Sequence, residues 1–220
     1  QHRKQGEITP EVLRSLDVPF QTLDSECSDI AGLVEESCKQ MQNYGGPAAI
    51  LVKKNTFSKY ELASSGEGNE YAMKREEAIH TILQHIPDKA RLVATTGMPG
   101  REVYDYREDN SQGHGQDFLT VGSMGHASSI ALGMALSDKA APVICLDGDG
   151  ASLMHLVAIP IIGNREPRNF IHLLLNNGAH DSVGGQPTVG FQTDLCAIAK
   201  ASGYKTSEMV DTRNGIETAI

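Results

Sequence analysis

The sequence predicts an α/β protein in which a parallel sheet has helices on both faces, preceded by the tail of a second α/β domain. Short apolar runs of strand length recur along the chain, and segments with helical periodicity lie between them. Several of these runs end in turns that contain glycine. Strands that alternate with helices in this way form βαβ units, whose strands are parallel.

Composition narrows the class of protein. The 220 residues are enough for one large domain or roughly one and a half ordinary ones. A net charge of −9 argues against nucleic acid as a partner. No apolar run is long enough to span a bilayer and no signal peptide is evident, so we expect no membrane partner. Scattered cysteines without metal-type pairing are typical of reduced core thiols, which predicts a cytoplasmic protein (Cys27, Cys38, Cys145 and Cys196).

Residues 1–60 are interpreted as the closing part of an α/β domain whose beginning is missing. Thr9-Pro10 is typical of a short helix start, and a brief strand is expected at Pro19–Leu23. Ser28 is the expected cap of a helix from Asp29 to about Asn43. A buried strand over residues 48–53 then ends this domain.

A polar stretch that contains glycine, Ser64–Glu70, marks the domain boundary. We therefore expect a linker over residues 61–73 and a second domain over residues 74–220. The chain begins with Gln1 and ends within an expected helix start at Arg213–Ile220. We interpret it as a fragment of a longer protein with a truncated C-terminus.

The second domain is expected to alternate helices with strands. Helices are predicted at residues 74–86, 101–107, 127–136 and 151–162, and at a segment capped by Thr193-Asp194 that reaches about Ser202. Strands are predicted at residues 91–95, 119–121, 141–146, 170–175 and 204–210. The glycine-bearing stretch 179–192 is expected to be a long loop.

One βαβ unit carries the strongest chemical signal. The apolar run 141–146 ends in Asp147-Gly148-Asp149-Gly150, and the run 170–175 ends in Asn176-Asn177-Gly178. Parallel strands joined by a helix end at the same edge of a sheet, where α/β folds bind ligands. Asp149 and Asn177 should therefore lie side by side and offer the oxygen ligands that Mg²⁺ prefers.

The turn itself suits an anion. Gly148 and Gly150 let the backbone turn sharply and approach a ligand closely. The amides of Gly150 and Ala151 open a helix, where unpaired donors attract phosphate. A carboxylate beside these donors would repel the anion unless a cation lay between them. The turn therefore predicts a diphosphate bridged to the protein by a metal.

These motifs resemble those of a known family. The sequence Gly148-Asp149-Gly150, followed after residues 151–175 by Asn176-Asn177, is similar to the thiamine-diphosphate signature of the decarboxylase and acetolactate synthase superfamily. The surrounding stretches resemble the phosphonopyruvate decarboxylase family, with sulfopyruvate decarboxylases as close rivals (residues 94–97, 100–102, 121–125, 147–151 and 176–188). The resemblance implies a thiamine-diphosphate-binding fold.

The resemblance also implies roles for particular residues. Asp149, the Asn177 side chain and the Ala179 carbonyl would bind Mg²⁺. The residues implied in binding thiamine diphosphate are Thr96, Gly97, Gly122, Ser123, Met124, Gly150 and Ala151. The residues implied at the substrate or in proton transfer are His180, Ser182 and Gln186.

The implied reaction is decarboxylation of 3-phosphonopyruvate to phosphonoacetaldehyde and CO₂ in phosphonate biosynthesis, and the alternative is decarboxylation of sulfopyruvate. The partner would be a small anionic 2-oxo acid. The implied assembly is a homo-oligomer, a dimer or larger, because the two halves of such sites usually come from different subunits.

One departure from the family pattern bears on activity. The glutamate that activates the cofactor belongs to an early part of the pyrimidine-binding domain that is absent here, and Glu7, Glu11 and Glu26 match its later part. We therefore expect this chain alone to be inactive, and a non-catalytic assembly module is a second hypothesis. A dinucleotide-binding domain is disfavoured because no Gly-x-Gly-x-x-Gly follows the first strand of the second domain.

Overall fold

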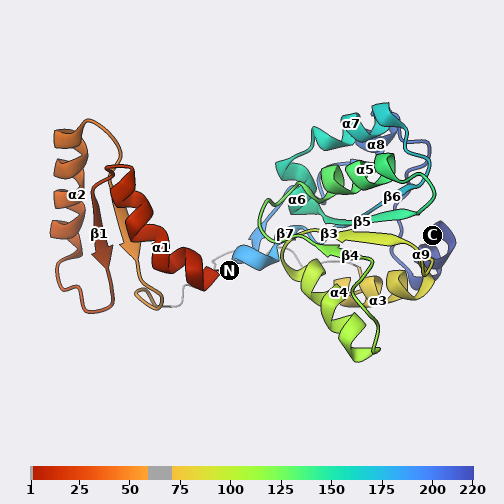
Figure 1. The fold of residues 1–220 in the computed structure, drawn as a ribbon, viewed down its shortest axis with the longest axis horizontal. Coiled ribbons are helices and arrows are strands. Elements are labelled where there is room, and N and C mark those ends of the chain that lie inside the picture. Colours follow the sequence, from red (N-terminus) through yellow and green to blue (C-terminus); the bar gives the residue numbers. More distant parts are fainter. Residues whose placement is uncertain (1, 59–70) are drawn as a thin grey trace. The chain divides into compact units, whose positions relative to one another are not determined.

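The computed structural model describes residues 2–58 and 71–220, and the chain divides into two compact units, residues 1–65 and 66–220 (Figure 1). Most of the expected linker, residues 61–73, lies outside the described residues. Among the described helices, none has both the length and the apolar character needed to cross a bilayer.

The first unit is a βαβ arrangement preceded by a helix. Its elements are α1 (His2–Ser15), β1 (Phe20–Leu23), α2 (Ile30–Tyr44) and β2 (Ala49–Val52). The two strands pair in parallel, with Phe20 opposite Ala49 and Leu23 opposite Val52. The crossover through α2 is what parallel pairing requires.

Two expected helix starts in this unit were wrong. α1 begins at His2 and contains Pro10, rather than opening there. α2 is capped by Asp29, whose carboxylate accepts a hydrogen bond from the Gly32 amide at 2.8 Å, and not by Ser28. Both residues have capping side chains, and Asp29 is the one whose carboxylate reaches a free amide of the first turn.

A parallel four-stranded sheet forms the second unit, with the strand order β4-β3-β5-β6. The strands are β3 (Arg91–Ala94), β4 (Asp117–Leu119), β5 (Val143–Gly148) and β6 (Phe170–Leu175). β5 and β6 pair along their whole lengths, from Val143 opposite Phe170 to Gly148 opposite Leu175. The carboxyl ends of these two strands therefore lie side by side.

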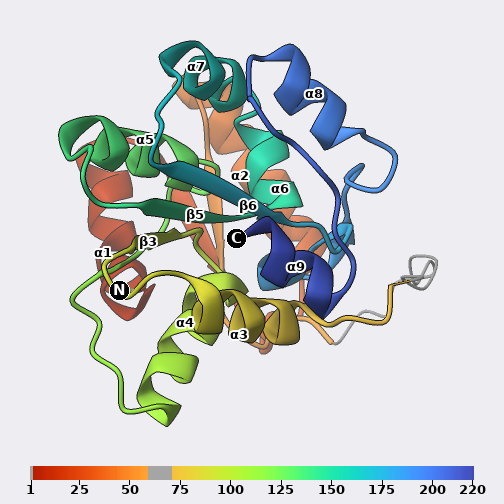
Figure 2. The same cartoon turned by 90° about the vertical axis from the view of Figure 1, so that its right-hand side faces the viewer.

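Helices cover both faces of this sheet (Figures 1 and 2). One face carries α3 (Arg75–His85), α4 (Met98–Asp109) and α9 (Arg213–Ala219). The other carries α5 (Ala127–Ser137), α6 (Asp149–Met154), α7 (Ala158–Arg165) and α8 (Leu195–Ala201). Helices on both faces of a parallel sheet are the predicted fold class.

The buried side chains alternate between these two faces. Successive residues of a strand point to opposite sides of a sheet. The core on the side of α3, α4 and α9 takes Leu92, Ala94, Ile144 and Leu146 from the strands. The core on the side of α5 takes Val93, Val143 and Cys145.

Three expected elements differ from the structure in kind, and the strand expected at 119–121 lies at 117–119 instead. The helix predicted over 151–162 is divided into α6 and α7, with the chain leaving helical geometry at His155 (φ −137°). Residues 204–210 form no strand, because this mostly polar stretch has no apolar face to bury and Met209 is 75% exposed. The expected loop after β6 contains a short hairpin of β7 (Ala179–His180) and β8 (Gln186–Pro187), with the 3₁₀ turn η1 (Asp181–Val183) between them.

Candidate functional site

A pocket lies where the carboxyl ends of β3, β5 and β6 meet the start of α4 and the loop after β6. Most of the residues that the sequence singled out line it, namely Thr96, Met124, Asp149, Gly150, Ala151, Asn177, Ala179, His180 and Ser182. The remaining predicted residues lie beside the pocket without lining it, namely Gly97, Gly122, Ser123 and Gln186. The structure thus brings the expected metal ligands into one cavity.

Asp149 provides a buried carboxylate in this pocket. It is the first residue of α6, and its side chain is fully buried. Within the described part of the chain, the Thr188 hydroxyl is the one donor to this carboxylate. An ionised carboxylate in such a position is costly unless it is paired. Its remaining lone pairs suit a hard divalent cation.

Asn177 lies at the end of the neighbouring strand. Its side-chain nitrogen donates a hydrogen bond to Asp181 Oδ2 at 2.8 Å. Its side-chain oxygen accepts one from the Ala179 amide at 3.3 Å. An amide oxygen has two lone pairs, so one remains for a cation in the same pocket.

The backbone beside Asp149 leaves room only for glycine. A Cβ on Gly150 would lie 2.4 Å from Nδ1 of His180, so the imidazole ring lies directly over this backbone. Gly97 precedes α4 as its N-cap residue with φ 105°, which residues with a side chain rarely adopt, and a Cβ there would approach Ser182 to 3.0 Å. The two glycines let the pocket walls close around backbone groups.

Thr95 carries an unpaired hydroxyl at the pocket. The residue is 2% exposed, and Oγ1 has no hydrogen-bond partner among residues 2–58 and 71–220. Buried hydroxyls almost always have a partner. Since Thr95 lines the pocket, an oxygen of a bound ligand would satisfy this group.

The loop after β4 supplies Met124. Gly122, Ser123 and Gly125 all have positive φ angles of 75°, 49° and 88°. Thr96 Oγ1 accepts a hydrogen bond from the Gly122 amide at 3.3 Å, which joins this loop to the end of β3. The turn brings Met124 into the pocket wall and leaves Gly122 and Ser123 behind it.

Arg75, Glu102 and Asp181 were missed by sequence reasoning. Arg75 and Asp181 line the pocket, and Arg75 contacts both carboxylates. The hydrogen bond with Glu102 raises the pKa of the Arg75 guanidinium, which stays charged. The one local signal was Glu102 within Gly-Arg-Glu at 100–102. Its partner lies 27 residues away, too far for a sequence pattern to reveal.

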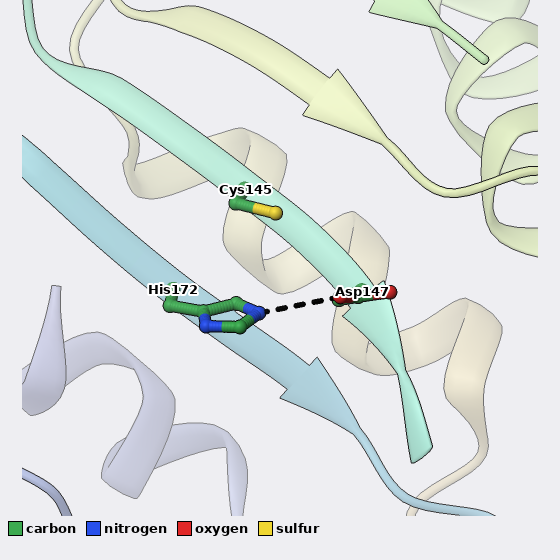
Figure 3. Close-up of side chains that lie close together, drawn as sticks. All are labelled: Cys145, Asp147 and His172. Atoms are coloured by element: carbon green, nitrogen blue, oxygen red, sulfur yellow. Dashed lines mark hydrogen bonds and ion pairs between the residues drawn. The ribbon is translucent and has the colours of Figure 1, made fainter. Parts of the chain in front are cut away.

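A buried polar cluster underlies the turn that carries Asp149. Cys145, Asp147 and His172 bring potential ligand atoms within 4.8 Å of one another (Figure 3). His172 Nε2 lies 3.4 Å from Asp147 Oδ2, and its Nδ1 lies 3.1 Å from the Tyr204 hydroxyl. Asp147 also accepts hydrogen bonds from the Gly148 amide and the Ser152 hydroxyl, at 2.9 and 3.0 Å.

Asp147 and His172 of this cluster are joined by hydrogen bonds to each other, to Tyr204 and to the turn. Burial raises the pKa of the Cys145 thiol well above its ordinary value of 9.0, and the charge of Asp147 adds to this effect. Burial likewise raises the pKa of Tyr204. The Gly148 amide and the Ser152 hydroxyl already donate to the Asp147 carboxylate, and the His172 ring lies beside it. We interpret the cluster as a hydrogen-bonded base for the turn.

The fold and the pocket define the class of protein, an α/β domain with a ligand pocket at the carboxyl edge of a parallel sheet. Residues 93–220 match the family model for the thiamine pyrophosphate enzyme C-terminal TPP-binding domain. The chain belongs to this family, and thiamine pyrophosphate is thiamine diphosphate. The expected fold and the expected cofactor are therefore confirmed.

The chain is also similar to particular decarboxylases. It is 37% identical over 152 residues to phosphonopyruvate decarboxylase of Streptomyces hygroscopicus, covering 69% of this chain and 36% of that protein. The corresponding enzyme of Streptomyces viridochromogenes is 29% identical, with 100% of this chain and 58% of that protein covered. Sulfopyruvate decarboxylase subunit beta of Methanocaldococcus jannaschii is 40% identical over 136 residues, covering 60% of this chain and 68% of that protein. The expected resemblance to these two families is confirmed.

Solved structures show the same fold. The crystal structure of benzoylformate decarboxylase from Polynucleobacter necessarius aligns with a TM-score of 0.55 at 17% identity, covering 92% of this chain and 41% of that one. At this identity the likeness concerns the fold alone. The matched chain spans 36% and 58% of the length of the two phosphonopyruvate decarboxylases.

Proposed function

We propose that the protein containing this chain decarboxylates 3-phosphonopyruvate to phosphonoacetaldehyde and CO₂, with thiamine diphosphate and Mg²⁺. One observation carries the proposal: the Asp149 carboxylate and the Asn177 amide share a pocket in a domain of the thiamine pyrophosphate family. The matches to phosphonopyruvate decarboxylases support the substrate. Phosphonate biosynthesis in the cytoplasm is the proposed setting.

The residues of the pocket fit the cofactor and its metal. Asp149, the Asn177 oxygen and the Ala179 carbonyl would hold Mg²⁺, which prefers oxygen ligands. Bound thiamine diphosphate supplies the electron-accepting chemistry that lets a 2-oxo acid lose CO₂. The unpaired Thr95 hydroxyl and the glycine-lined backbone at Gly150 support the fit.

The chain's own groups then bind and orient the cofactor. The diphosphate would lie against the backbone of Gly150 and Ala151 and against Thr96 and Gly97. Gly122, Ser123 and Met124 would form the wall beside its aminopyrimidine ring. Amide and hydroxyl donors in these positions would hold the negative charge together with the metal.

The substrate side of the pocket is proposed to lie at the hairpin after β6. His180 and Ser182 line the pocket, where they would hydrogen-bond the substrate or hold a proton near it. Gln186 pairs with His180 in the hairpin and is exposed, so it would contact the outer end of the substrate. A small anionic 2-oxo acid fits these donors.

The first unit is proposed to close a pyrimidine-binding domain. Residues 2–58 contribute a βαβ pair, and Glu7, Glu11 and Glu26 are proposed to match the later part of that domain and not its activating residue. The complete site would therefore need the rest of that domain, supplied within a homo-oligomer of at least two subunits. The chain alone is proposed to be inactive. Under the second hypothesis, a non-catalytic module, the longer protein would lack turnover as well.

A substrate comparison tests this function. The intact protein, with Mg²⁺ and thiamine diphosphate, should release CO₂ from phosphonopyruvate with a higher kcat/KM than from sulfopyruvate or pyruvate. Equal or faster turnover of sulfopyruvate would favour the second candidate, which the 40% identity to a sulfopyruvate decarboxylase subunit supports. Absence of turnover on all three, with bound cofactor, would favour the non-catalytic module.

A further inference from the structure

A chain of charged hydrogen bonds ends at the proposed metal ligand Asn177. The Arg75 guanidinium donates through Nε and Nη2 to the Glu102 carboxylate, at 3.0 and 2.9 Å. Its Nη1 donates to Asp181 Oδ2 at 2.6 Å. The same Asp181 oxygen accepts the Asn177 side-chain nitrogen at 2.8 Å. Four side chains are thus joined in the order Glu102, Arg75, Asp181 and Asn177.

This chain differs from an ordinary surface ion pair. The Arg75 and Glu102 side chains are 18% and 13% exposed, and their contact is two-pronged. Exposed single pairs contribute little, but a two-pronged, largely buried guanidinium–carboxylate pair has a defined geometry. Arg75 opens α3 and Glu102 lies in α4, so the guanidinium is held by two helices. Asp181 is 42% exposed, and Arg75 is the cation that contacts it in the described part of the chain.

The link to Asn177 determines what its amide can do. Asp181 is acceptor-only when ionised, so it selects the nitrogen of the Asn177 amide. The oxygen of that amide is then directed to the other side, where it accepts a hydrogen bond from the Ala179 amide and keeps one lone pair free. Rotation of the amide by half a turn would put two oxygens together at Asp181. The charge of Asp181 therefore excludes the orientation in which Asn177 offers a nitrogen to a cation.

We propose that Glu102, Arg75 and Asp181 are positioning residues that orient the Asn177 oxygen toward the divalent cation. The proposal rests on the function proposed above, because it needs Asn177 as a metal ligand. Arg75 acts here through Asp181, and its charge also offsets the second carboxylate near the cation. Groups that orient a metal ligand in this way affect metal affinity about 10- to 100-fold when they are removed.

The test measures metal binding directly. Mn²⁺ replaces Mg²⁺ in the intact protein at saturating thiamine diphosphate, and free Mn²⁺ is followed by its electron paramagnetic resonance signal. Asp181→Ala and Arg75→Gln should each weaken Mn²⁺ binding about 10- to 100-fold. The double variant should bind about as weakly as Asp181→Ala alone, since Arg75 acts through that residue.

Arg107→Gln is the matched control. Arg107 makes the same kind of two-pronged contact with Asp117, at 3.1 and 3.2 Å, and the side chains are 14% and 1% exposed. Asp117 opens β4, at the opposite edge of the sheet from the pocket. This variant should lose stability in urea yet bind Mn²⁺ as the wild type does.

Three results would overturn the inference. Asp181→Ala with wild-type Mn²⁺ affinity would show that Asn177 needs no such support. Losses that multiply in the double variant would show that Arg75 acts by another route, such as direct contact with the cofactor. Equal weakening in Arg107→Gln would trace the effect to general instability. If the wild type bound no Mn²⁺ with the cofactor, the metal assignment itself would fall, which is a distinct outcome.

Discussion

At the scale of single residues, a close contact between a backbone and an imidazole ring shapes the pocket. His180 lies over Gly150, and a Cβ at that position would come within 2.4 Å of Nδ1 and 2.5 Å of Cε1. Gly150 is buried and belongs to α6, where a glycine is otherwise a weak choice. The contact therefore explains why the residue after Asp149 is a glycine.

Gly150→Ala should destabilise the protein by about 1–3 kcal/mol, because the added methyl group displaces His180. It should also weaken binding of thiamine diphosphate. Urea unfolding and calorimetric titration measure the two effects. The matched control is Gly133→Ala in α5, where a Cβ would meet nothing within 4 Å. This control should gain about 0.5–1 kcal/mol, and equal stability of the two variants would contradict the contact.

Single residues also show how far sequence reasoning reaches. Asp149 and Asn177 were predictable because each follows an apolar run, and parallel strands end at one edge. Arg75 and Asp181 were not, since 106 residues separate them and nothing local marks either as a partner. Such a pair becomes visible only when α3 and the hairpin after β6 are placed in space.

At the scale of elements, the register of β5 and β6 creates the polar cluster beneath the turn. Cys145 lies opposite His172, and Asp147 follows on the same face of β5. Ser152 in α6 and the amide of Gly148 donate to Asp147. The cluster thus ties both strands to the helix that begins with Asp149.

This cluster predicts how stability changes with pH. The folded state raises the pKa of Cys145 above its unfolded value, so the thiol's contribution is complete below the unfolded pKa and is lost as pH rises toward the folded one. The free energy of unfolding in urea should fall between about pH 8.5 and pH 10, by up to about 1.4 kcal/mol per pH unit. The Cys145→Ala variant should have a lower free energy of unfolding at pH 8.5, and that free energy should fall less as the pH rises. An equal slope in both proteins would contradict the assignment.

Elements were predicted where apolar runs were continuous. β3, β5 and β6 are fully or half-buried along their lengths, and a run of apolar residues marks each of them. The break at His155 between α6 and α7 was not marked, because helical periodicity continues through it. Residues 204–210 form no strand although β6 has only one partner in the described sheet, because this mostly polar run has no apolar face to bury.

At the scale of the whole molecule, charge decides how an anionic cofactor is held. The chain has a net charge of −9, so its overall field repels a diphosphate and an anionic substrate. Two of these negative charges lie in the pocket, the buried Asp149 and the half-exposed Asp181, and Arg75 offsets only the second. A divalent cation would reverse the local balance, which is why metal and cofactor should bind together.

Mg²⁺ and thiamine diphosphate together should therefore raise the unfolding temperature more than either does alone. At a cofactor concentration of 100 times Kd the stabilisation is about 2.7 kcal/mol, and a chelator should abolish it. Thermal unfolding followed by circular dichroism measures the shift. Asp149→Asn should lose the shift and keep or improve the ligand-free stability, because it removes a buried charge. A full shift in Asp149→Asn would refute the metal assignment.

The continuous pairing of β5 with β6 limits how this domain can change. A strand advances about 3.3 Å per residue and alternates its faces, so deleting one residue from β6 would draw Asn177 away and turn His172 to the other side of the sheet. Insertions in the connection that contains α7 leave that pairing untouched. Insertions and deletions should consequently occur between His155 and Asn169, while the number of residues from Phe170 to Asn177 should stay constant.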